Sequence, residues 1–248
     1  MGVSVHAITE RETVAYVADG WNAGKGGWLH TINLDHLRMI HAGLFFPEGL
    51  PDAELRVCDG APLVWASRIQ GTPIPERVAG SDLIRSLTQA AAKDQRKVFF
   101  LGGNPGSAEG AAAQLSEEFP GFEIAGILCP DFGFEKDDAA LSAITDALLA
   151  AEPDLVFVAV GAPKSERLIQ DWAPMMPKTW WAGVGISFSF VTGEVKRAPR
   201  WMQVTGVEWI HRLLQEPKRL AKRYLVHGLP FAARLLWASL AYRFRRKG

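Results

Sequence analysis

The sequence predicts an α/β fold in which a parallel sheet carries helices on both faces. Short, continuously apolar runs typical of buried strands alternate along the chain with segments whose apolar residues recur at helical spacing. Turns that contain glycine or aspartate lie where these apolar runs end. Repeated units of strand, turn and helix indicate a Rossmann-like sheet.

Four such units follow one another in the same order. The expected strands are a run that ends near Thr31, and then Leu55–Cys58, Val98–Leu101 and Leu155–Val160. The turns after them contain, in the same order, Asn33, Asp59–Gly60, Gly102–Gly103 and Gly161–Pro163. A helix is expected after each turn, the third capped near Ser107 and the fourth starting at Lys164.

Several strand-end residues are expected to meet at one edge of this sheet. In doubly wound sheets ligands bind at the carboxyl ends of the strands, where glycine lets the backbone approach and helix N-termini favour phosphate. The residues expected there are Thr31, Asp59, Gly102, Gly103 and Gly161. Each glycine alone is explained equally well by a tight turn. Their coincidence on one edge favours a binding cleft.

Missing motifs and the composition disfavour several classes of protein. The first strand is not followed by G-x-G-x-x-G, and neither a P-loop nor HExxH nor GxSxG occurs, which disfavours dehydrogenases, NTPases, metalloproteases and serine hydrolases. The two cysteines, Cys58 and Cys129, match no disulfide framework or zinc spacing and fit a reducing compartment. No apolar run approaches the roughly 20 residues of a spanning helix. We therefore expect a protein that is neither secreted nor membrane-spanning.

The net charge of zero conceals a strong division along the chain. Residues 196–248 contain 13 Lys and Arg but 2 Asp and Glu, a charge of +11, so residues 1–195 carry −11. Such asymmetry predicts a basic appendage that meets an anionic surface, either membrane or nucleic acid. We therefore expect an α/β domain over residues 1–195 and a basic helical appendage over residues 196–248.

A series of short blocks then resembles a known family. In order between about Thr31 and Leu225 they are TIN, CDGAPLVW, ERVAGSDL, FFLGG, PDFGF, GAPKSE, GVG, RAPRWM and GVEWIHRLLQEPKRLAKRYL. Together they resemble the WecG/TagA/CpsF glycosyltransferases, glycosyltransferase family 26. The resemblance implies an inverting transferase, without metal or other cofactor, that moves a sugar from a UDP-sugar to an undecaprenyl-diphosphate-linked sugar. The resemblance further implies a role in the synthesis of bacterial cell-surface polysaccharide or exopolysaccharide, at the cytoplasmic face of the plasma membrane. It leaves open whether the protein self-associates.

The resemblance assigns catalytic roles near the start of the chain. Asp59 matches the aspartate of the family's DG block, its proposed base, because an attacking hydroxyl must lose a proton. The alternative is a helix N-cap. Thr31, counted with the catalytic residues, and Asn33 match the T-x-N block, where each could bind sugar or cap the next helix. Arg77, Ser81 and Asp82 are expected to frame the same site, with the Arg77 guanidinium on a phosphate or a carboxylate.

The donor nucleotide is expected on the glycine-rich side. Candidates are Gly102, Gly103, Phe132, Phe134, Gly161, Lys164, Ser165 and Glu166. Either phenylalanine could stack on uracil, although an aromatic residue near a sheet edge is more often part of the core. The chain departs from the family at Ser165, where GAPKQE is usual, and at Ser189, where GGTFDF has aspartate. Both changes leave the identity of the sugar open.

The basic appendage is predicted to bind the membrane. Its cations alternate with apolar residues, as in interfacial helices, and each cation near anionic lipid adds roughly 1 kcal/mol. By resemblance, some arginines also hold the lipid diphosphate, namely Arg200, Arg212, Arg219 and Arg223. The alternatives are a solvated helix packed on the core and a nucleic-acid partner, which the apolar content and the lack of a reader motif disfavour. For the whole chain, the alternatives are a non-enzymatic nucleotide-sugar sensor docked on membranes and a dehydrogenase-type protein.

Overall fold

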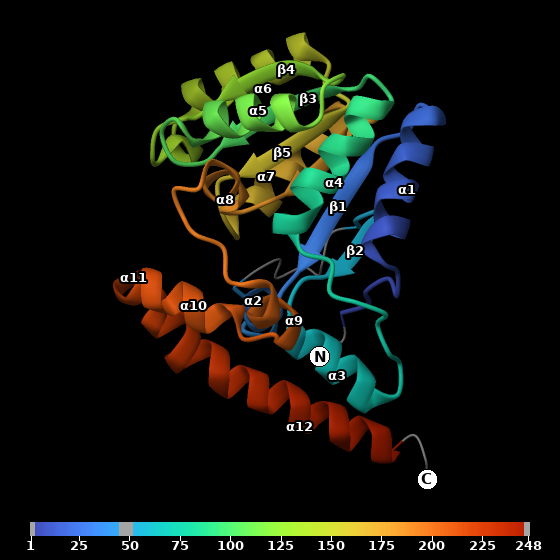
Figure 1. Cartoon of the computed structure of the whole chain (residues 1–248), viewed down its shortest axis with the longest axis vertical. Coiled ribbons are helices and arrows are strands. Elements are labelled where there is room, and N and C mark those ends of the chain that lie inside the picture. The colour runs from blue at the N-terminus through green and yellow to red at the C-terminus, as the bar shows by residue number, and fades with distance from the viewer. Residues whose placement is uncertain (1–2, 45–51, 246–248) are drawn as a thin grey trace.

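The computed structural model describes residues 3–44 and 52–245, and their centre is a parallel sheet of six strands (Figure 1). The strand order is β2-β1-β6-β5-β3-β4. The strands are β1 (Gly27–Ile32), β2 (Leu55–Cys58), β3 (Lys97–Gly102), β4 (Glu123–Leu128), β5 (Leu155–Ala159) and β6 (Trp180–Gly183). This arrangement confirms the predicted α/β class with its Rossmann-like sheet.

The inner strands are buried on both faces, which explains their continuous apolar sequence. Every residue of β5 is buried, and β5 pairs with β3 in the register Val98 to Leu155. The edge strand β4 is half exposed and begins with Glu123. Its weaker apolar pattern explains why β4 was not among the predicted strands. The other strand without a prediction is β6.

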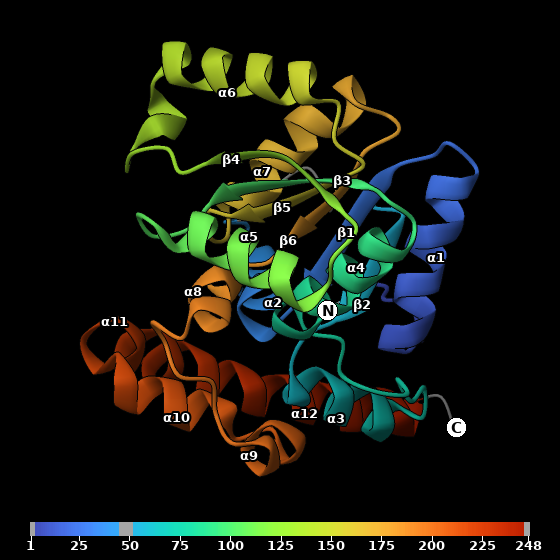
Figure 2. The ribbon, with the colours of Figure 1, turned by 45° about the horizontal axis from the view of Figure 1, so that its top comes forward.

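Helices cover both faces of the sheet (Figure 2). One face packs on α1 (Glu10–Asn22), α4 (Gly80–Lys93), α5 (Ser107–Glu118) and α8 (Ser187–Thr192). The other face packs on α6 (Asp138–Ala151) and α7 (Lys164–Trp172). Short 3-10 turns lie at Phe134–Lys136 and Ala173–Met175. Alternate side chains of each strand enter the two cores, so Phe100 belongs to one and Phe99 to the other.

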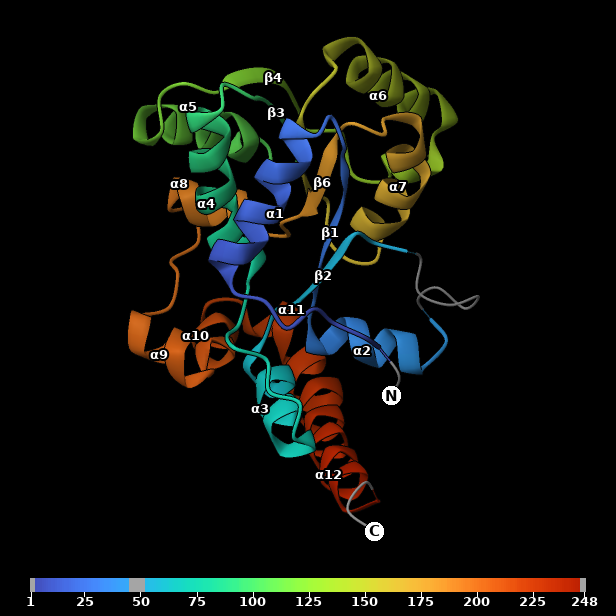
Figure 3. The same cartoon turned by 90° about the vertical axis from the view of Figure 1, so that its right-hand side faces the viewer.

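A third cluster of buried residues joins the end of the sheet to the C-terminal helices. Helices α2 (Leu34–His41) and α3 (Ala61–Gln70) follow β1 and β2. Phe231 and Leu235 of α12 (Leu229–Arg245) pack with Leu63 and Val64 of α3 in this cluster, and the amide of Gln70 donates to the Ser239 hydroxyl at 2.9 Å. Helix α12 therefore runs along α3 beyond the sheet (Figure 3).

The remaining C-terminal elements are short. They are α9 (Arg200–Thr205), α10 (Glu208–Gln215), α11 (Pro217–Ala221) and a π-helix (Lys222–Gly228). The expected boundary between residues 195 and 196 falls in the segment that connects α8 to α9, and it stays a prediction, while residues 246–248 of the expected appendage lie outside the described residues. Among residues 3–44 and 52–245, no helix is long and apolar enough to cross a bilayer.

Candidate active site

A cavity of about 860 Å³ lies at the carboxyl ends of the strands, between the sheet and the C-terminal helices. Residues that end or follow all six strands line it, from Thr31 near the end of β1 to Gly183 at the end of β6. Side chains of α10, α11 and the π-helix line the side away from the sheet. In Figure 1 these C-terminal helices lie below the sheet, across the ends of the strands. The cavity is therefore enclosed by two walls of different origin, the sheet wall and the appendage wall.

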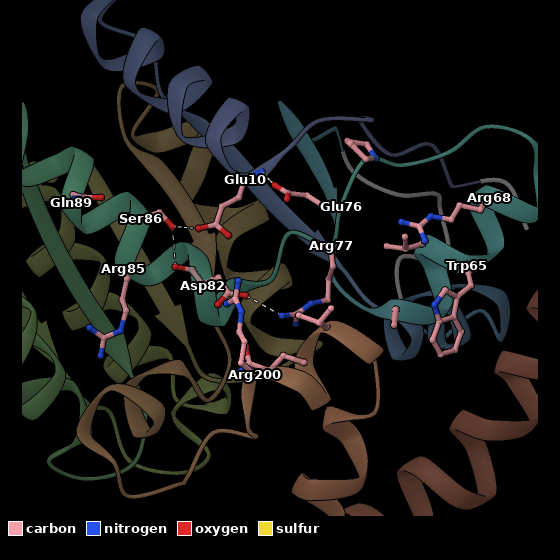
Figure 4. Close-up of a pocket in the computed structure, with 15 residues that line it drawn as sticks. Glu10, Trp65, Arg68, Glu76, Arg77, Asp82, Arg85, Ser86, Gln89 and Arg200 are labelled. Carbon is pink, nitrogen blue, oxygen red and sulfur yellow. Dashed lines mark hydrogen bonds and ion pairs between the residues drawn. The ribbon is translucent and has the colours of Figure 1, made fainter.

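The cavity brings together most of the residues expected in the site. Those that line it are Thr31, Asn33, Asp59, Arg77, Ser81, Gly102, Gly103, Phe132, Phe134, Gly161, Lys164, Ser165, Glu166, Arg212, Arg219 and Arg223. Asp82 and Arg200 do not line this cavity, although Asp82 pairs with Arg77, which does. Both line a neighbouring cavity of about 660 Å³ between α3, α4 and α9 (Figure 4).

Asp59 follows β2 and presents its carboxylate to the cavity. Its backbone amide donates to the Ile32 carbonyl at 2.7 Å, which extends the pairing of β1 with β2 by one residue. The N-cap of α3 is Gly60, with φ of 132°, and no side chain caps this helix. The Asp59 carboxylate is therefore not used as a cap, and its role as a base stays a prediction.

The charges around Asp59 leave its carboxylate poorly paired. Arg77 Nη1 lies 3.8 Å from Asp59 Oδ1, beyond hydrogen-bonding distance. The same guanidinium donates to Asp82 Oδ2 at 3.1 Å, as Figure 4 shows. Burial raises the pKa of Asp59, Arg77 lowers it, and the carboxylate of Glu208 raises it further. A carboxylate with a raised pKa and a weak partner is suited to accept a proton.

Thr31 and Asn33 have different surroundings. The Asn33 side chain caps α2 by accepting from the amides of Asp35 and His36, each at 3.0 Å, so the predicted capping alternative holds for Asn33. Thr31 is buried at the end of β1, and its hydroxyl donates to the Gly183 carbonyl at 3.4 Å. This long bond leaves the Thr31 hydroxyl oxygen available as an acceptor at the cavity wall.

The cavity also holds a buried histidine and carboxylate pair. His36 Nδ1 accepts from the Asn33 amide, which assigns the proton to Nε2, and Nε2 lies 3.3 Å from Glu166 Oε1. Among the described residues, three side chains have possible metal-ligand atoms that all lie within 4.8 Å of one another. They are those of His30, His36 and Glu166. His36 and Glu166 therefore lie within ion-pair distance of each other at the cavity. His30 stacks on Trp28, and burial lowers its pKa well below 6.5.

Two polar atoms beside this pair have no hydrogen-bond partner within the described ranges. They are Ser165 Oγ and Glu166 Oε2, and both belong to residues that line the cavity. A buried polar atom without a partner costs about 1–3 kcal/mol, and a ligand hydroxyl would remove this cost. Ser165, one of the departures from the family, therefore lies where a hydroxyl group of a ligand can be bound.

The glycine-rich side allows the backbone to approach a ligand. Gly102 has φ of 92° and Gly103 has φ of 90°, a conformation that favours glycine. A Cβ on Gly102 would also lie 2.6 Å from Val160 Cγ1. Lys164 pairs with Glu135 at 2.6 Å, so its ammonium group is held at the cavity. Phe134 is buried in the core, in agreement with the alternative that an aromatic residue near a sheet edge is a core residue. Phe132, in contrast, is 94% exposed at the cavity.

Ser189, the second departure from the family, is buried and also lines the cavity. The amide of Asn104 donates to the Ser189 hydroxyl at 3.3 Å, and that hydroxyl donates to Glu194 Oε2 at 2.9 Å. A carboxylate is therefore present near position 189, supplied by a residue further along the chain. The sequence alone did not indicate this contribution of Glu194.

The appendage wall is cationic. Arg212 is held over the ring of Phe190 at 5.4 Å and lies 3.8 Å from Glu216. Arg219 pairs with Glu216 at 2.6 Å and keeps 59% of its side chain exposed. Arg223 pairs with Asp35 of α2 at 3.0 Å. The three predicted arginines thus share one wall, opposite the strand ends.

Sequence reasoning missed residues whose role depends on the packing of the appendage. Glu208 and Trp209 of α10 line the cavity, and Glu208 Oε2 lies 3.6 Å from Arg77 Nη1. Arg197 lies 2.6 Å from Asp82 Oδ1. Glu208 belongs to the quoted EW block, and it is one of the two acidic residues in a segment with 13 cations, which was the available signal.

The fold is that of an α/β protein with a Rossmann-like parallel sheet, and cationic C-terminal helices line one side of the cavity at its strand ends. The sequence model of the Glycosyl transferase WecG/TagA/CpsF family matches residues 1–245. The chain belongs to this family, as the resemblance predicted.

Two curated relatives have the same name, N-acetylglucosaminyldiphosphoundecaprenol N-acetyl-beta-D-mannosaminyltransferase. The protein from Bacillus spizizenii is 35% identical over 170 residues, 68% of this chain and 64% of that protein. The protein from Bacillus subtilis is 34% identical over 161 residues, 65% of this chain and 60% of that protein. The matched segment thus spans less than two thirds of either relative.

Proposed function

We propose that this protein is an inverting glycosyltransferase that moves a sugar from a UDP-sugar to a polyprenyl-diphosphate-linked sugar. The observation that carries the proposal is the placement of Asp59, whose weakly paired carboxylate lies in a cavity between glycine-lined strand ends and a wall of arginines. The family and the name of the two relatives support the same class of reaction. Their name makes an N-acetylmannosaminyl donor and an N-acetylglucosaminyl-diphosphoundecaprenol acceptor the first pair to assay.

The proposed reaction is a single displacement at the anomeric carbon. The acceptor hydroxyl gives its proton to Asp59 while its oxygen forms the new bond to the anomeric carbon. The bond from that carbon to the β-phosphate oxygen breaks, and UDP leaves with the electron pair, so the configuration inverts. We assign the stabilisation of the charge on the departing diphosphate to the Lys164 ammonium, which lies at the cavity beside the turn at Gly102 and Gly103.

The two substrates are assigned to the two walls of the cavity. The sheet wall takes the nucleotide sugar, and the unpartnered Ser165 Oγ and Glu166 Oε2 accept hydroxyl groups of the donor. The appendage wall takes the lipid-linked acceptor, whose diphosphate binds Arg212, Arg219 and Arg223. Arg200 faces the neighbouring cavity and is assigned to the membrane surface rather than to this diphosphate.

The test is transfer by the purified full chain. UDP-N-acetylmannosamine and a short-chain polyprenyl-diphosphate N-acetylglucosamine are incubated with the protein, and UDP release and the glycosylated lipid are measured. Asp59→Asn is expected to lower kcat by about 10²- to 10⁴-fold while UDP binding is kept.

The matched control is Asp131→Asn, which removes a carboxylate from the same cavity on the loop after β4. It is expected to stay within about threefold of wild type, because a carboxylate that takes no proton contributes little to the barrier. Full activity of Asp59→Asn would contradict the assigned base. Tight UDP-sugar binding without transfer to any polyprenyl acceptor would support the non-enzymatic sensor instead.

We further propose that the protein docks on the cytoplasmic face of the plasma membrane through α12. Trp237, Leu240 and Phe244 are exposed at helical spacing on one face of α12, and Trp237 is 73% exposed. Arg234 and Arg243 lie on the same helix. Phe231 and Leu235 on the other face are buried against α3. This amphipathic arrangement is typical of interfacial helices.

Vesicle flotation tests this docking. Trp237→Glu is expected to reduce binding to vesicles that contain phosphatidylglycerol by about 10-fold, since it removes an exposed aromatic group that would enter the bilayer interface and adds a charge that anionic lipid repels. The control is Leu149→Glu on α6, which lies at the end of the molecule opposite α12 (Figure 1). Equal flotation of the two variants would contradict the docking face.

A further inference from the structure

The guanidinium of Arg77 is surrounded by three carboxylates. Arg77 Nη2 lies 3.1 Å from Asp82 Oδ2, and Nη1 lies 3.6 Å from Glu208 Oε2 and 3.8 Å from Asp59 Oδ1. A second guanidinium, that of Arg197, joins two of these carboxylates. It lies 2.6 Å from Asp82 Oδ1 and 3.8 Å from Glu208 Oε1. These five residues form one network.

The three carboxylates of the network differ in how closely the two guanidinium groups approach them. Asp82 contacts both guanidinium groups at hydrogen-bonding distance, and Glu208 lies near both. Asp59 has a single ion-pair contact, at 3.8 Å, among the described residues. With three carboxylates and two guanidinium groups, one negative charge is left over. The geometry leaves this charge at Asp59.

The members of the network come from both walls of the cavity. Asp59 and Arg77 belong to the sheet wall, directly after β2 and in the loop between α3 and α4, and Asp82 lies behind Arg77 in the first turn of α4. Glu208 is the first residue of α10, and Arg197 precedes α9. All five side chains are between 17% and 28% exposed, so solvent screens the network only in part. Packing of the appendage therefore adds one carboxylate and one guanidinium beside the proposed base.

From this arrangement we infer that Glu208 is a positioning residue, which holds Arg77 away from Asp59 and so keeps the Asp59 carboxylate basic. The inference rests on the proposed role of Asp59 as the base. Arg197 supports Glu208 by carrying part of the charge of Asp82 and Glu208. The appendage thus contributes to proton transfer as well as to binding of the acceptor.

The groups that face Asp59 set the direction of the expected effect. They are Arg77 from the loop before α4, Asp82 from α4, His36 from α2 and Glu208 from α10. Arg77 and His36 lower the pKa of Asp59, whereas burial, Glu208 and Asp82 raise it. Removing the charge of Glu208 takes away one repulsion and one competitor for Arg77 Nη1. Both changes lower the pKa of Asp59 and weaken it as a base.

The decisive experiment is the pH profile of kcat for Glu208→Gln, with UDP-N-acetylmannosamine and the polyprenyl-diphosphate acceptor both saturating. The acid limb is expected to move to lower pH, and the plateau of kcat is expected to fall about 10-fold, because a weaker base takes the proton less readily. In an Asp59→Asn background the same substitution is expected to leave the residual rate unchanged.

The control is Glu216→Gln, which removes the other carboxylate of the appendage. Glu216 pairs with Arg212 and Arg219 and makes no contact with Arg77 among the described residues. Its acid limb is expected to coincide with that of wild type, whatever happens to KM. An acid limb of Glu208→Gln that also coincides with wild type, with a change in KM alone, would overturn the positioning role. If Asp59→Asn were fully active, the proposed base itself would fall, which is a separate result.

Discussion

The two walls of the cavity are built in different ways. The sheet wall consists of strand ends that emerge from two hydrophobic cores, and Gly102 and Gly103 bring its backbone to the surface of the cavity. The appendage wall consists of arginine side chains on short helices, attached to the core by few buried residues, chiefly Phe231 and Leu235. The sheet wall is therefore expected to be rigid. The appendage wall is expected to open at lower free energy, because local opening follows the apolar area that holds an element.

The largest effect is expected from pH, at Asp59, where the two walls meet. Burial raises the pKa of Asp59 above 3.8, so the carboxylate becomes protonated at higher pH than a free aspartate. The base works in its ionised form, so kcat rises with pH through this pKa and is lost below it, by about 100-fold or more. Saturating assays between about pH 4 and pH 8, with circular dichroism to follow the fold, measure this limb. A rate that stays flat to the acid end would contradict the assignment.

The sheet wall is expected to respond to substitution through the stability of the whole protein. Gly103→Ala places a Cβ against Ser107 Oγ and 2.9 Å from Phe188 Cδ2, at φ of 90°. The free energy of unfolding is expected to fall by about 3 kcal/mol, and denaturant melts measure it. The control is Gly106→Ala, where φ is also positive, at 80°, but no atom lies within 4 Å of the new Cβ. The control is expected to cost about 1 kcal/mol. Equal losses would show that the contacts with Ser107 and Phe188 contribute nothing.

The appendage wall is expected to respond through use of the acceptor. Phe231→Ala removes a buried ring from the contact of α12 with α3 and favours opening of the appendage. We expect kcat/KM for the polyprenyl acceptor to fall about 10-fold, while UDP affinity measured by calorimetry changes less than about twofold. An equal loss of UDP binding would show that the two walls are not independent.

The smallest effect is expected for a substitution that keeps the charge. Arg212→Lys loses the stacking of the guanidinium over Phe190, seen at 5.4 Å, while a cation stays at the cavity. The KM for the acceptor is expected to rise about threefold, as cation–π contacts contribute about 0.5–1 kcal/mol. Arg234→Lys, on α12 outside the cavity, is the control. A rise of about 100-fold would indicate bidentate binding of the diphosphate rather than simple charge.

Local patterns predicted the sheet wall with some accuracy. The strand at Leu55–Cys58 has the bounds predicted for it, and α7 starts at Lys164 as expected. The helix expected to be capped near Ser107 starts at Ser107, with Gly106 as its N-cap. The strand expected over Leu155–Val160 ends one residue earlier, at Ala159. These elements were predictable because a strand buried on both faces needs continuous apolar residues, and its exit turn needs glycine or a small polar residue. Helix α1 had no prediction, since its apolar stripe is short and mixed with charges.

The sequence by itself determined the fold class, the edge of the sheet that carries the site, the family and the cationic character of the appendage. Each of these depends on residues close together in the chain or on ordered blocks. The tertiary structure decided which carboxylate is left weakly paired, because Glu208 is far from Asp59 and Arg77 in sequence and meets Arg77 only through the packing of the C-terminal helices. It also decided that Gly60 and not Asp59 caps α3, and that Arg200 faces a separate cavity. Ion pairs depend on distances of a few ångströms between distant segments, and local patterns do not contain these distances.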